Sequence, residues 1–420
     1  MCGISGFICF SKNLTSSKLK KEALSMANSL SKRGPDSFGV WTDVTNGLAL
    51  SHRRLSIIDL SSNANQPMMS KSKRFVIVYN GEVYNFKTLR KIIQQNGVVL
   101  KSLSDTEVIL ELISLYGFND AIKKLNGIFS LAVWDRKNKK LFLARDRVGI
   151  KPLYIYNDNQ NFAFASEIKA IKKLSFSSLS IDRESLSTYV RLNYIPSPFS
   201  IFKSVSKLEP GSIFIIDLKK NTQKKKFWNV EDFEKKTKNS NPEDTFHVLN
   251  NAVKNQMVSD VPLGVFLSGG IDSSLIAALA QKNSKKKISS FTIGFNESEF
   301  DEAKYARAIS KQLGMNHNEV YFDYSELNNL VELIPDIYDE PFADSSQLPT
   351  FLLSQITKKN VTVALSGDGG DELFGGYYRY FLAEKYQRYI FSQPYLIKTI
   401  IKNIIKIFPT TFWNNFGCIL

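Results

Sequence analysis

The pattern of apolar stretches changes once along the chain, and this change constrains the fold more than any other feature. In residues 1–200, short apolar or aromatic stretches alternate with Gly, Asn and Asp, which predicts strands. A polar, lysine-rich stretch follows at residues 221–244. Beyond it, strand-like and helix-like segments alternate, as they do in a parallel sheet covered by helices. Because 420 residues is also long for one core, we expect two domains of different class.

The first domain is expected to be α+β, with stacked antiparallel sheets and helices laid on them. Its predicted helices cover residues 17–30 and 106–116, the latter with Ser104 or Asp105 as N-cap. Its predicted strands cover residues 4–10, 47–51, 75–79, 129–134, 141–145, 153–156 and 162–165. The second domain is expected to be a doubly wound α/β fold. Its strands are predicted at residues 263–267, 291–295, 319–322 and 361–365, and its helices at residues 273–281, 302–313 and 347–357.

The charge and the cysteine content of the chain indicate which binding partners and which cellular compartment to expect. The formal charge of +15 would suit nucleic acid. The lysines lie in short scattered runs, however, and no zinc-finger or helix-turn-helix pattern accompanies them, so we expect no nucleic-acid partner. The three cysteines, Cys2, Cys9 and Cys418, are too few for a disulfide framework and fit a reducing compartment. No signal-peptide pattern opens the chain, and we expect a cytoplasmic protein.

Residues 395–408 are apolar, except for a stripe formed by Lys398, Lys402 and Lys406. This spacing predicts a helix with one basic edge. The segment is too short and too charged to span a membrane. We favour a core helix with one wet edge, and a helix lying on a membrane surface is the alternative.

Cys2 lies where it becomes the first residue once Met1 is removed. It would then carry a thiol and a free α-amine, whose ordinary pKa of about 7.7–8.0 lets the amine act as a base. A thiol with such a base can attack an amide without a histidine. By itself, however, a cysteine here equally suits a buried side chain at the start of a strand.

Two further motifs supply what such a nucleophile needs. Asn80-Gly81 offers a side-chain amide and an accessible backbone N–H to an oxyanion, although Asn-Gly also suits a hairpin turn. Arg54 and Asp105 offer a guanidinium and a carboxylate for the two charged ends of an amino acid. Their plainer interpretations are a surface charge and a helix cap.

Together with Arg33-Gly34-Pro35-Asp36, these motifs resemble the class II glutaminase domain, an N-terminal-nucleophile hydrolase. The resemblance covers roughly the first 200 residues. It implies that Cys2 is the nucleophile and that Asn80 and Gly81 form the oxyanion hole. It also implies a glutamine site made of Arg54, Leu55, Ser56, Ile57, Ile58, Asn80, Gly81, Glu82 and Asp105.

Two glycine-rich loops of the second domain each follow a predicted strand. Residues 268–274 read Ser-Gly-Gly-Ile-Asp-Ser-Ser and lead into a helix, whose N-terminus favours an anion. Residues 366–377 contain Asp368, Asp371 and Glu372. Both loops should lie at the carboxyl edge of one parallel sheet, where such folds bind ligands. Carboxylates close to a polyphosphate suit Mg²⁺, although the first loop alone would suit a simple helix cap.

The two loops resemble the ATP-pyrophosphatase fold of glutamine-hydrolysing asparagine synthetases, and with the glutaminase motifs the resemblance covers nearly the whole chain. It implies Mg²⁺ ligands at Asp272 and Asp371 and a catalytic carboxylate at Asp368, where the family often has Glu. It implies an ATP site made of Leu267, Ser268, Gly269, Gly270, Asp272, Ser273, Ser274, Ile293, Ser366 and Gly367. It also implies that ammonia passes inside the protein to a carboxylate activated by ATP.

The expected domains are a glutaminase domain at residues 2–205, connecting strands and a linker at 206–240, and a synthetase domain at 241–420. Because family members continue past the second loop, we expect the last domain to be incomplete at its C-terminus. The expected substrates are glutamine, ATP and aspartate. The sequence leaves open whether the chain forms a homodimer. One alternative acceptor is another carboxylate, such as a uronic acid of a surface polysaccharide, for which residues 339–346 should be decisive. The other alternative is a glutaminase-only or synthesis-dead protein with a binding or regulatory role.

Overall fold

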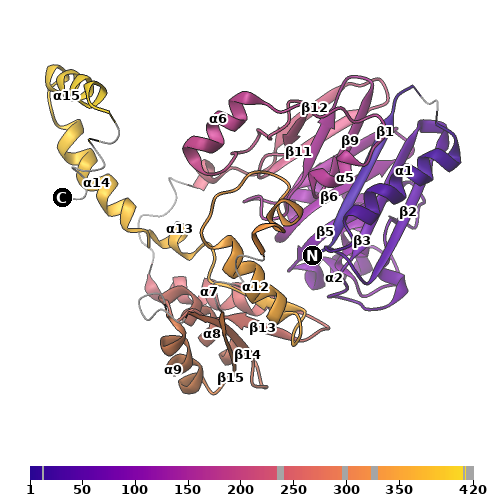
Figure 1. Cartoon of the computed structure of the whole chain (residues 1–420). Helices are drawn as coiled ribbons and strands as arrows, with labels where there is room; N and C mark the ends of the chain where they lie inside the picture. The colour runs from indigo at the N-terminus through magenta and orange to yellow at the C-terminus, as the bar shows by residue number, and fades with distance from the viewer. Residues whose placement is uncertain (12–13, 234–240, 296–300, 323–329, 410–411, 413–420) are drawn as a thin grey trace.

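The computed structural model describes residues 1–11, 14–233, 241–295, 301–322, 330–409 and 412 (Figure 1). Within them lie two six-stranded antiparallel sheets and one four-stranded parallel sheet. The sheets follow one another along the chain, as the change of sequence pattern predicts. Part of the expected linker, residues 234–240, and Cys418 lie outside the described residues.

The two antiparallel sheets are built from the first 226 residues. The first sheet has the order β10 (Val205–Lys207), β8 (Tyr154–Asn157), β9 (Asn161–Ala165), β1 (Gly3–Cys9), β3 (Leu48–Arg54), β2 (Ser37–Asp43). The second has the order β12 (Thr222–Lys226), β11 (Ser212–Asp217), β7 (Lys140–Arg145), β6 (Gly127–Asp135), β5 (Phe75–Val83), β4 (Met68–Met69). The neighbouring helices are α1 (Ser16–Ser29), α2 (Phe86–Gln95), α3 (Asp105–Tyr116), α4 (Phe118–Lys124), α5 (Ile168–Lys172) and α6 (Arg183–Leu192).

Three apolar clusters show that this half is a four-layer sandwich. One cluster, including Ile4, Leu50 and Trp134, fills the space between the two sheets. A second lies between the first sheet and α1 and α5, and a third between the second sheet and α2, α3 and α4. The order helix, sheet, sheet, helix is the expected α+β architecture of stacked antiparallel sheets with helices.

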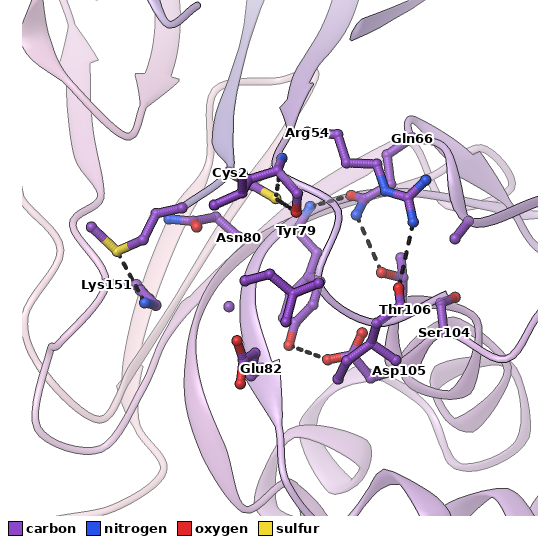
Figure 2. A pocket seen from close by; sticks show the side chains of 16 residues that line it. Cys2, Arg54, Gln66, Tyr79, Asn80, Glu82, Ser104, Asp105, Thr106 and Lys151 are labelled. Atoms are coloured by element: carbon purple, nitrogen blue, oxygen red, sulfur yellow. Dashed lines mark hydrogen bonds between the residues drawn. The ribbon is translucent and has the colours of Figure 1, made fainter. Parts of the chain in front are cut away.

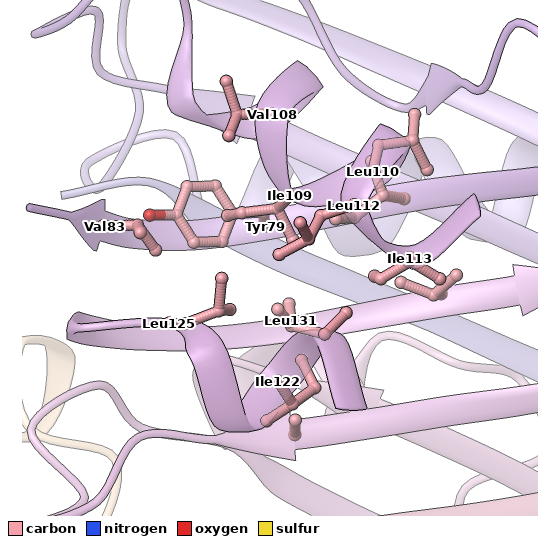
Figure 3. Packing of buried hydrophobic residues seen from close by; sticks show 14 of the residues in the cluster. Tyr79, Val83, Val108, Ile109, Leu110, Leu112, Ile113, Ile122, Leu125 and Leu131 are labelled. Carbon is pink, nitrogen blue, oxygen red and sulfur yellow. The ribbon is translucent and has the colours of Figure 1, made fainter. Parts of the chain in front are cut away.

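Helix α3 shows how the sandwich positions polar groups. The side-chain oxygen of Ser104 accepts the N–H of Glu107, so Ser104 is the N-cap. The apolar side chains of α3 then pack on the second sheet, as Ile109 and Ile113 do beside Leu131 in Figure 3. Because packing fixes this helix, Asp105 in its first turn is also fixed, at the edge of the sheet.

The parallel sheet has the order β15 (Asn316–Phe322), β14 (Ser289–Phe295), β13 (Leu263–Phe266), β16 (Val363–Leu365). Its helices include α7 (Pro242–Gln256), α8 (Ile271–Asn283), α9 (Ala303–Leu313), α11 (Ile334–Ile337) and α12 (Gln347–Thr357). A single apolar cluster, including Val265, Ala277 and Ala306, joins β13 to α8 and α9. Strands alternating with helices in this way confirm the predicted α/β class.

Three helices end the described part of the chain, and the last of them departs from the prediction. They are α13 (Gly370–Phe374), α14 (Tyr378–Phe391) and α15 (Tyr395–Ile407). Figure 1 shows α14 and α15 extending away from the rest of the molecule. Neither has a buried residue, and Tyr395 is 82% exposed. The prediction of a core helix at residues 395–408 is therefore wrong for this structure, because the apolar side chains of α15 remain largely exposed. No helix of the described residues is long and apolar enough to cross a bilayer.

The lysine-rich stretch predicted as linker includes an edge strand. Residues 222–226 pair with β11 as β12, and all five are exposed. Exposed lysines on an edge strand discourage pairing with another chain, so their abundance does not require a linker. Neither β2 nor α2 was predicted from the sequence. Strand β2 shows no alternation of buried and exposed residues, whereas α2 does carry a helical signal, since Phe86, Leu89 and Ile93 share its buried face.

Candidate active site

A pocket at the edge of the sandwich contains Cys2 (Figure 2). Cys2 lies directly before β1, and its Sγ accepts the N–H of Leu55 at 3.4 Å. Nearly all of the glutamine-site residues predicted from the sequence line this pocket: Arg54, Leu55, Ile57, Ile58, Asn80, Gly81, Glu82 and Asp105. Ser56 does not line it, and its backbone N–H donates to Asp36 Oδ2 at 2.7 Å.

Asn80 and Gly81 lie on β5 beside Cys2. Asn80 is 1% exposed, yet neither Oδ1 nor Nδ2 has a hydrogen-bond partner among the described residues. A buried amide without a partner costs free energy, so such a group points to a ligand. Gly81 is required by close packing, since a Cβ there would lie 2.6 Å from Phe129 Cα on β6. Both residues therefore line the pocket, and the Asn80 amide is available to a ligand.

Arg54, at the end of β3, is buried, and most of its guanidinium N–H groups already donate hydrogen bonds. Its Nη1 donates to Ser61 O at 2.9 Å and Asn65 Oδ1 at 3.0 Å. Its Nη2 donates to Asp59 O and to Ile58 O. These bonds account for four of the five guanidinium N–H groups. Arg54 therefore holds the loop that forms one wall of the pocket, and within the described residues only its Nε–H is left for a ligand.

Asp105 is fixed by two donors from β5. Tyr79 Oη lies 2.8 Å and Val83 N lies 3.0 Å from Asp105 Oδ2. Burial raises the pKa of Asp105, against the effect of these donors. Burial, and after it the charge of Asp105, raises the pKa of nearby Glu82 to about 7. The pocket thus holds two carboxylates that repel each other, a site suited to an ammonium group.

Several residues of the pocket were not predicted from the sequence. Tyr79 Oη orients Asp105, and Gln66 accepts the N–H of Tyr79 at 2.7 Å while donating to Thr106 Oγ1 at 3.2 Å. Lys151 is buried in the same pocket, where its Nζ lies 3.0 Å from Met1 Sδ. A lone Gln or Lys in a loop carries no local signal, so only the fold reveals these contacts.

Burial also decides which groups near Cys2 can exchange a proton. It raises the pKa of the Cys2 thiol and lowers the pKa of the chain's amino terminus, here that of Met1, to about 5. It lowers the pKa of Lys151 as well. His52, on β3, has a pKa lowered to about 3 by burial and bonds Tyr79 O at 3.1 Å. Among these groups, the amino terminus is the one that is both next to Cys2 and neutral near pH 7.

The second set of predicted residues gathers at the carboxyl edge of the parallel sheet. Strands β13, β14 and β16 are parallel and in register, so the segments after Phe266 and Leu365 emerge together. Leu267 is buried, with its N–H 3.0 Å from Phe291 O, and Ile293 lies near the end of β14. The structure therefore brings both glycine-rich loops to one place, as predicted.

The first loop is closed by its own hydroxyls. Ser268 Oγ lies 3.0 Å from Ser273 Oγ and 3.3 Å from Gly270 N, and Ser274 Oγ donates to Gly270 O at 2.6 Å. Gly269 has a φ of +92°, which favours glycine. The loop thus turns tightly into the start of α8, and Ser268 and Gly270 of the loop stay exposed.

The two loops touch at Asp272. A Cβ on Gly370 would lie 2.5 Å from Asp272 Oδ2, and one on Gly367 would lie 2.8 Å from Ser273 N. Only glycines allow this approach. Asp368 accepts the hydroxyl of Ser366 at 2.9 Å. Asp371, by contrast, has its Oδ1 against Gly376, so the structure does not direct both predicted metal ligands to one point.

The donors of these loops decide whether a divalent cation fits. No group of three or more His, Cys, Asp or Glu side chains in the described residues is arranged as a metal site. Mg²⁺, however, is commonly bound by one or two carboxylates plus substrate phosphates. Asp272, beside a glycine-rich loop, fits that mode.

The segment expected to select the acceptor begins with two carboxylates that face the sandwich instead. Glu340 pairs with Lys207 at 2.7 Å and accepts Tyr154 Oη at 3.1 Å. Asp339 pairs with Lys169 at 3.3 Å. Both side chains therefore join the two halves of the chain.

Comparisons with known proteins agree with this division. The glutamine amidotransferase domain family matches residues 1–228, and the asparagine synthase family matches residues 245–406. The chain is thus a glutamine amidotransferase joined to an asparagine synthase domain. A protein of Methanocaldococcus jannaschii, provisionally named a glutamine-hydrolysing asparagine synthetase, is 37% identical to this chain. The match covers 90% of this chain and 76% of the length of that protein. The chain belongs to the family of glutamine-hydrolysing asparagine synthetases.

Longer relatives and solved structures complete the comparison. Asparagine synthetases 1 and 3 of Bacillus subtilis are 36% and 35% identical over 90% of this chain. The chain spans only 59% and 63% of their lengths. Among solved structures, the glutamine phosphoribosylpyrophosphate amidotransferase of B. subtilis has a TM-score of 0.41 and 17% identity, over 86% of this chain and 71% of that one. A likeness at this level adds nothing to the family assignment.

Proposed function

We propose that the chain transfers the amide nitrogen of glutamine to a carboxylate activated by ATP, with aspartate as the acceptor and asparagine as the product. The observation that carries the proposal is the buried Asn80 amide without a partner among the described residues, next to Cys2 in a pocket of the right chemistry. We assign glutamine hydrolysis to residues 2–205 and synthesis to residues 241–420. We also propose that the reaction takes place in the cytoplasm.

In the first half-reaction, the Cys2 thiol attacks the side-chain amide carbon of glutamine. The α-amine that Cys2 carries after loss of Met1 takes the thiol proton and returns it to the leaving nitrogen, which departs as ammonia. Asn80 Nδ2 and the Gly81 N–H stabilise the negative oxygen of the tetrahedral intermediate. Water then cleaves the thioester by the same route and releases glutamate.

Glutamine is held at its other end by charge. We propose that Asp105 binds the substrate ammonium, with Glu82 nearby, and that Arg54 Nε binds the carboxylate. The buried position of Asp105 supports this role, since a buried carboxylate gains from a cation that pairs with it. The backbone of residues 55–58 forms the adjoining wall.

In the second half-reaction, the acceptor carboxylate attacks the α-phosphorus of ATP and pyrophosphate leaves. The N–H groups of the loop at residues 268–274 and the start of α8 are suited to the phosphates. Asp272 and Asp371 would hold Mg²⁺, which neutralises the charge on the departing pyrophosphate. Ammonia from Cys2 then displaces AMP, with Asp368 placed beside Ser366 to assist.

The alternatives differ in the fate of the ammonia. Another acceptor, such as a uronic acid, would use the same chemistry. A protein that hydrolyses glutamine without synthesis would release no pyrophosphate. Asp368 in place of the family's frequent Glu keeps the first alternative open, because its carboxylate reaches one methylene less far.

The test is a screen of acceptors with both products measured. The protein is incubated with glutamine and Mg-ATP, and glutamate, pyrophosphate and asparagine are quantified with aspartate, with a uronic acid, and without acceptor. Aspartate-dependent pyrophosphate in equal amount to asparagine is the expected result. Pyrophosphate released only with the uronic acid would show that the uronic acid, and not aspartate, is the acceptor. Glutamate released without pyrophosphate, whichever acceptor is present, would refute synthesis.

A further inference from the structure

A row of alternating charges crosses from the synthetase half to the nucleophile. Asp339 Oδ1 lies 3.3 Å from Lys169 Nζ, and Lys169 Nζ lies 3.1 Å from Glu167 Oε2. Glu167 Oε1 accepts Arg33 Nη1 at 2.9 Å. Arg33 Nε donates to the backbone oxygen of Cys2, also at 2.9 Å. Each link is within hydrogen-bond or ion-pair distance, so the row is continuous from residue 339 to residue 2.

We propose that Asp339 is a positioning residue for the glutaminase nucleophile, acting through Lys169, Glu167 and Arg33 on the Cys2 carbonyl. The inference rests on the proposed function of Cys2. It assigns to a residue of the synthetase half a part in the glutamine reaction, whereas the sequence suggested a part in acceptor selection.

The burial of the row supports the proposal. The side chain of Asp339 is 7% exposed, that of Arg33 12% and that of Glu167 18%. Ion pairs that are largely removed from water are weakly screened and depend on geometry. A displacement of one member therefore changes the best position of the next, which an exposed salt bridge does not do.

The geometry of the carboxylates restricts the row to one arrangement. Asp339 uses both oxygens on one residue, since Oδ2 also accepts the backbone N–H of Lys169 at 2.9 Å. Glu167 uses one oxygen for each cation. The last bond ends on the Cys2 carbonyl, which is kept when Met1 is removed. The row therefore fixes the backbone that carries both the thiol and the α-amine.

The adjacent residue provides a matched control. Glu340 also joins the two halves, through Lys207, Tyr154 Oη and the N–H of Ile201 at 2.8 Å. None of these partners belongs to the row. If the segment at residues 339–340 only docked the halves, loss of either carboxylate would have the same effect.

The experiment measures kcat and KM for glutamine hydrolysis in the full chain, without ATP or acceptor. The proteins are wild type, Asp339→Asn, Lys169→Met, the double variant and Glu340→Gln. The amide introduced by Asp339→Asn retains an oxygen for the Lys169 N–H, so the fold is kept, and thermal unfolding checks this.

We expect Asp339→Asn and Lys169→Met each to lower kcat about tenfold or more, since small misplacements of reacting groups are costly. KM for glutamine stays within about twofold, because the glutamine-binding groups are untouched. The double variant is no worse than the worse single variant, because both interrupt one row. Glu340→Gln keeps the wild-type kcat.

Three results would overturn the proposal: an unchanged kcat for Asp339→Asn, equal losses for Asp339→Asn and Glu340→Gln, or multiplied losses in the double variant. Failure of the proposed function itself is distinguishable. In that case wild type would release no glutamate, or Cys2→Ala would release as much.

Discussion

The two sites of this chain differ in how completely the fold has built them. The residues around Cys2 are buried and fixed by the sandwich: Asn80, Arg54 and Asp105 are each 5% exposed or less. The loops of the synthetase half lie on the surface, with Ser268 and Gly270 exposed. The difference teaches that a site between packed layers is preorganised by its core, whereas a site on loops at a sheet edge depends on its ligands for its final geometry.

The first way to test this comparison is to remove the nucleophile. Cys2→Ala should lower glutamine hydrolysis by about 10⁴-fold or more, since the thiol forms the covalent intermediate. Synthesis supplied with free ammonia should continue, because the second site lies on a different sheet. Glutamate and pyrophosphate release, measured with glutamine and then with an ammonium salt, check both halves of the prediction. Equal loss with both nitrogen sources would contradict the assignment of separate sites.

The reciprocal change removes Asp272. Asp272→Asn should lower pyrophosphate release by about 10³-fold, because an amide holds Mg²⁺ less well than a carboxylate. Glutamine hydrolysis without ATP should stay unchanged. If both activities fell together, the division of labour between the sites would be wrong. Higher Mg²⁺ concentrations should restore part of the lost activity, and no such recovery would contradict a role in metal binding.

Asn80→Ala tests whether the Asn80 side chain serves the reaction or the stability of the fold. Loss of one oxyanion donor should lower kcat about a hundredfold. The Asn80 amide has no partner among the described residues, so its removal leaves no donor or acceptor newly orphaned. We therefore expect Tm to change by only a few degrees. A large fall in Tm, with kcat reduced in proportion to the folded fraction, would identify Asn80 as structural.

Parts of the fold and of the sites can be predicted from local sequence, and the rest cannot. The N-cap at Ser104 and the strand before Ser268 are visible in a few neighbouring residues. The pairing of Gln66 with Tyr79 and Thr106, and the burial of Lys151, depend on which layers meet. Asp339 shows the same limit: its sequence neighbours suggest the acceptor site, and only the folded chain brings it to Lys169.

The exposed helix α15 gave the clearest wrong prediction. An apolar stretch with a lysine stripe indicates one face of a core, and pattern alone does not say whether a partner layer is present. In the sandwich, each apolar face meets a second layer, so the same kind of reasoning succeeded there. Periodicity predicts that a face prefers burial, and tertiary structure decides whether it is buried.

The smallest expected effect concerns the pH dependence of glutamine hydrolysis. The amino terminus must be neutral to take the thiol proton, and burial lowers the pKa of the Met1 amine to about 5. Loss of Met1 would leave the α-amine on Cys2, which lines the same pocket, so we expect the pKa of that amine to be lowered too. The acid limb of kcat/KM should then lie below the ordinary range of about 7.7–8.0, because a lowered pKa keeps the base neutral at lower pH. An acid limb within that ordinary range would show that the amine is solvated rather than buried.

Two neighbours should move that limb in opposite directions. The negative charge of Glu82 favours the protonated amine and the positive charge of Lys151 disfavours it. Lys151→Met should therefore shift the acid limb to higher pH by about half a unit. Glu82→Gln should shift it to lower pH by less, because Glu82, with a pKa raised to about 7, is largely protonated at the acid limb. Profiles of kcat/KM for both variants, beside wild type, measure the shifts. Shifts of the same sign would mean that the limb reports a group other than the amine, and the buried site would then be preorganised around a different base.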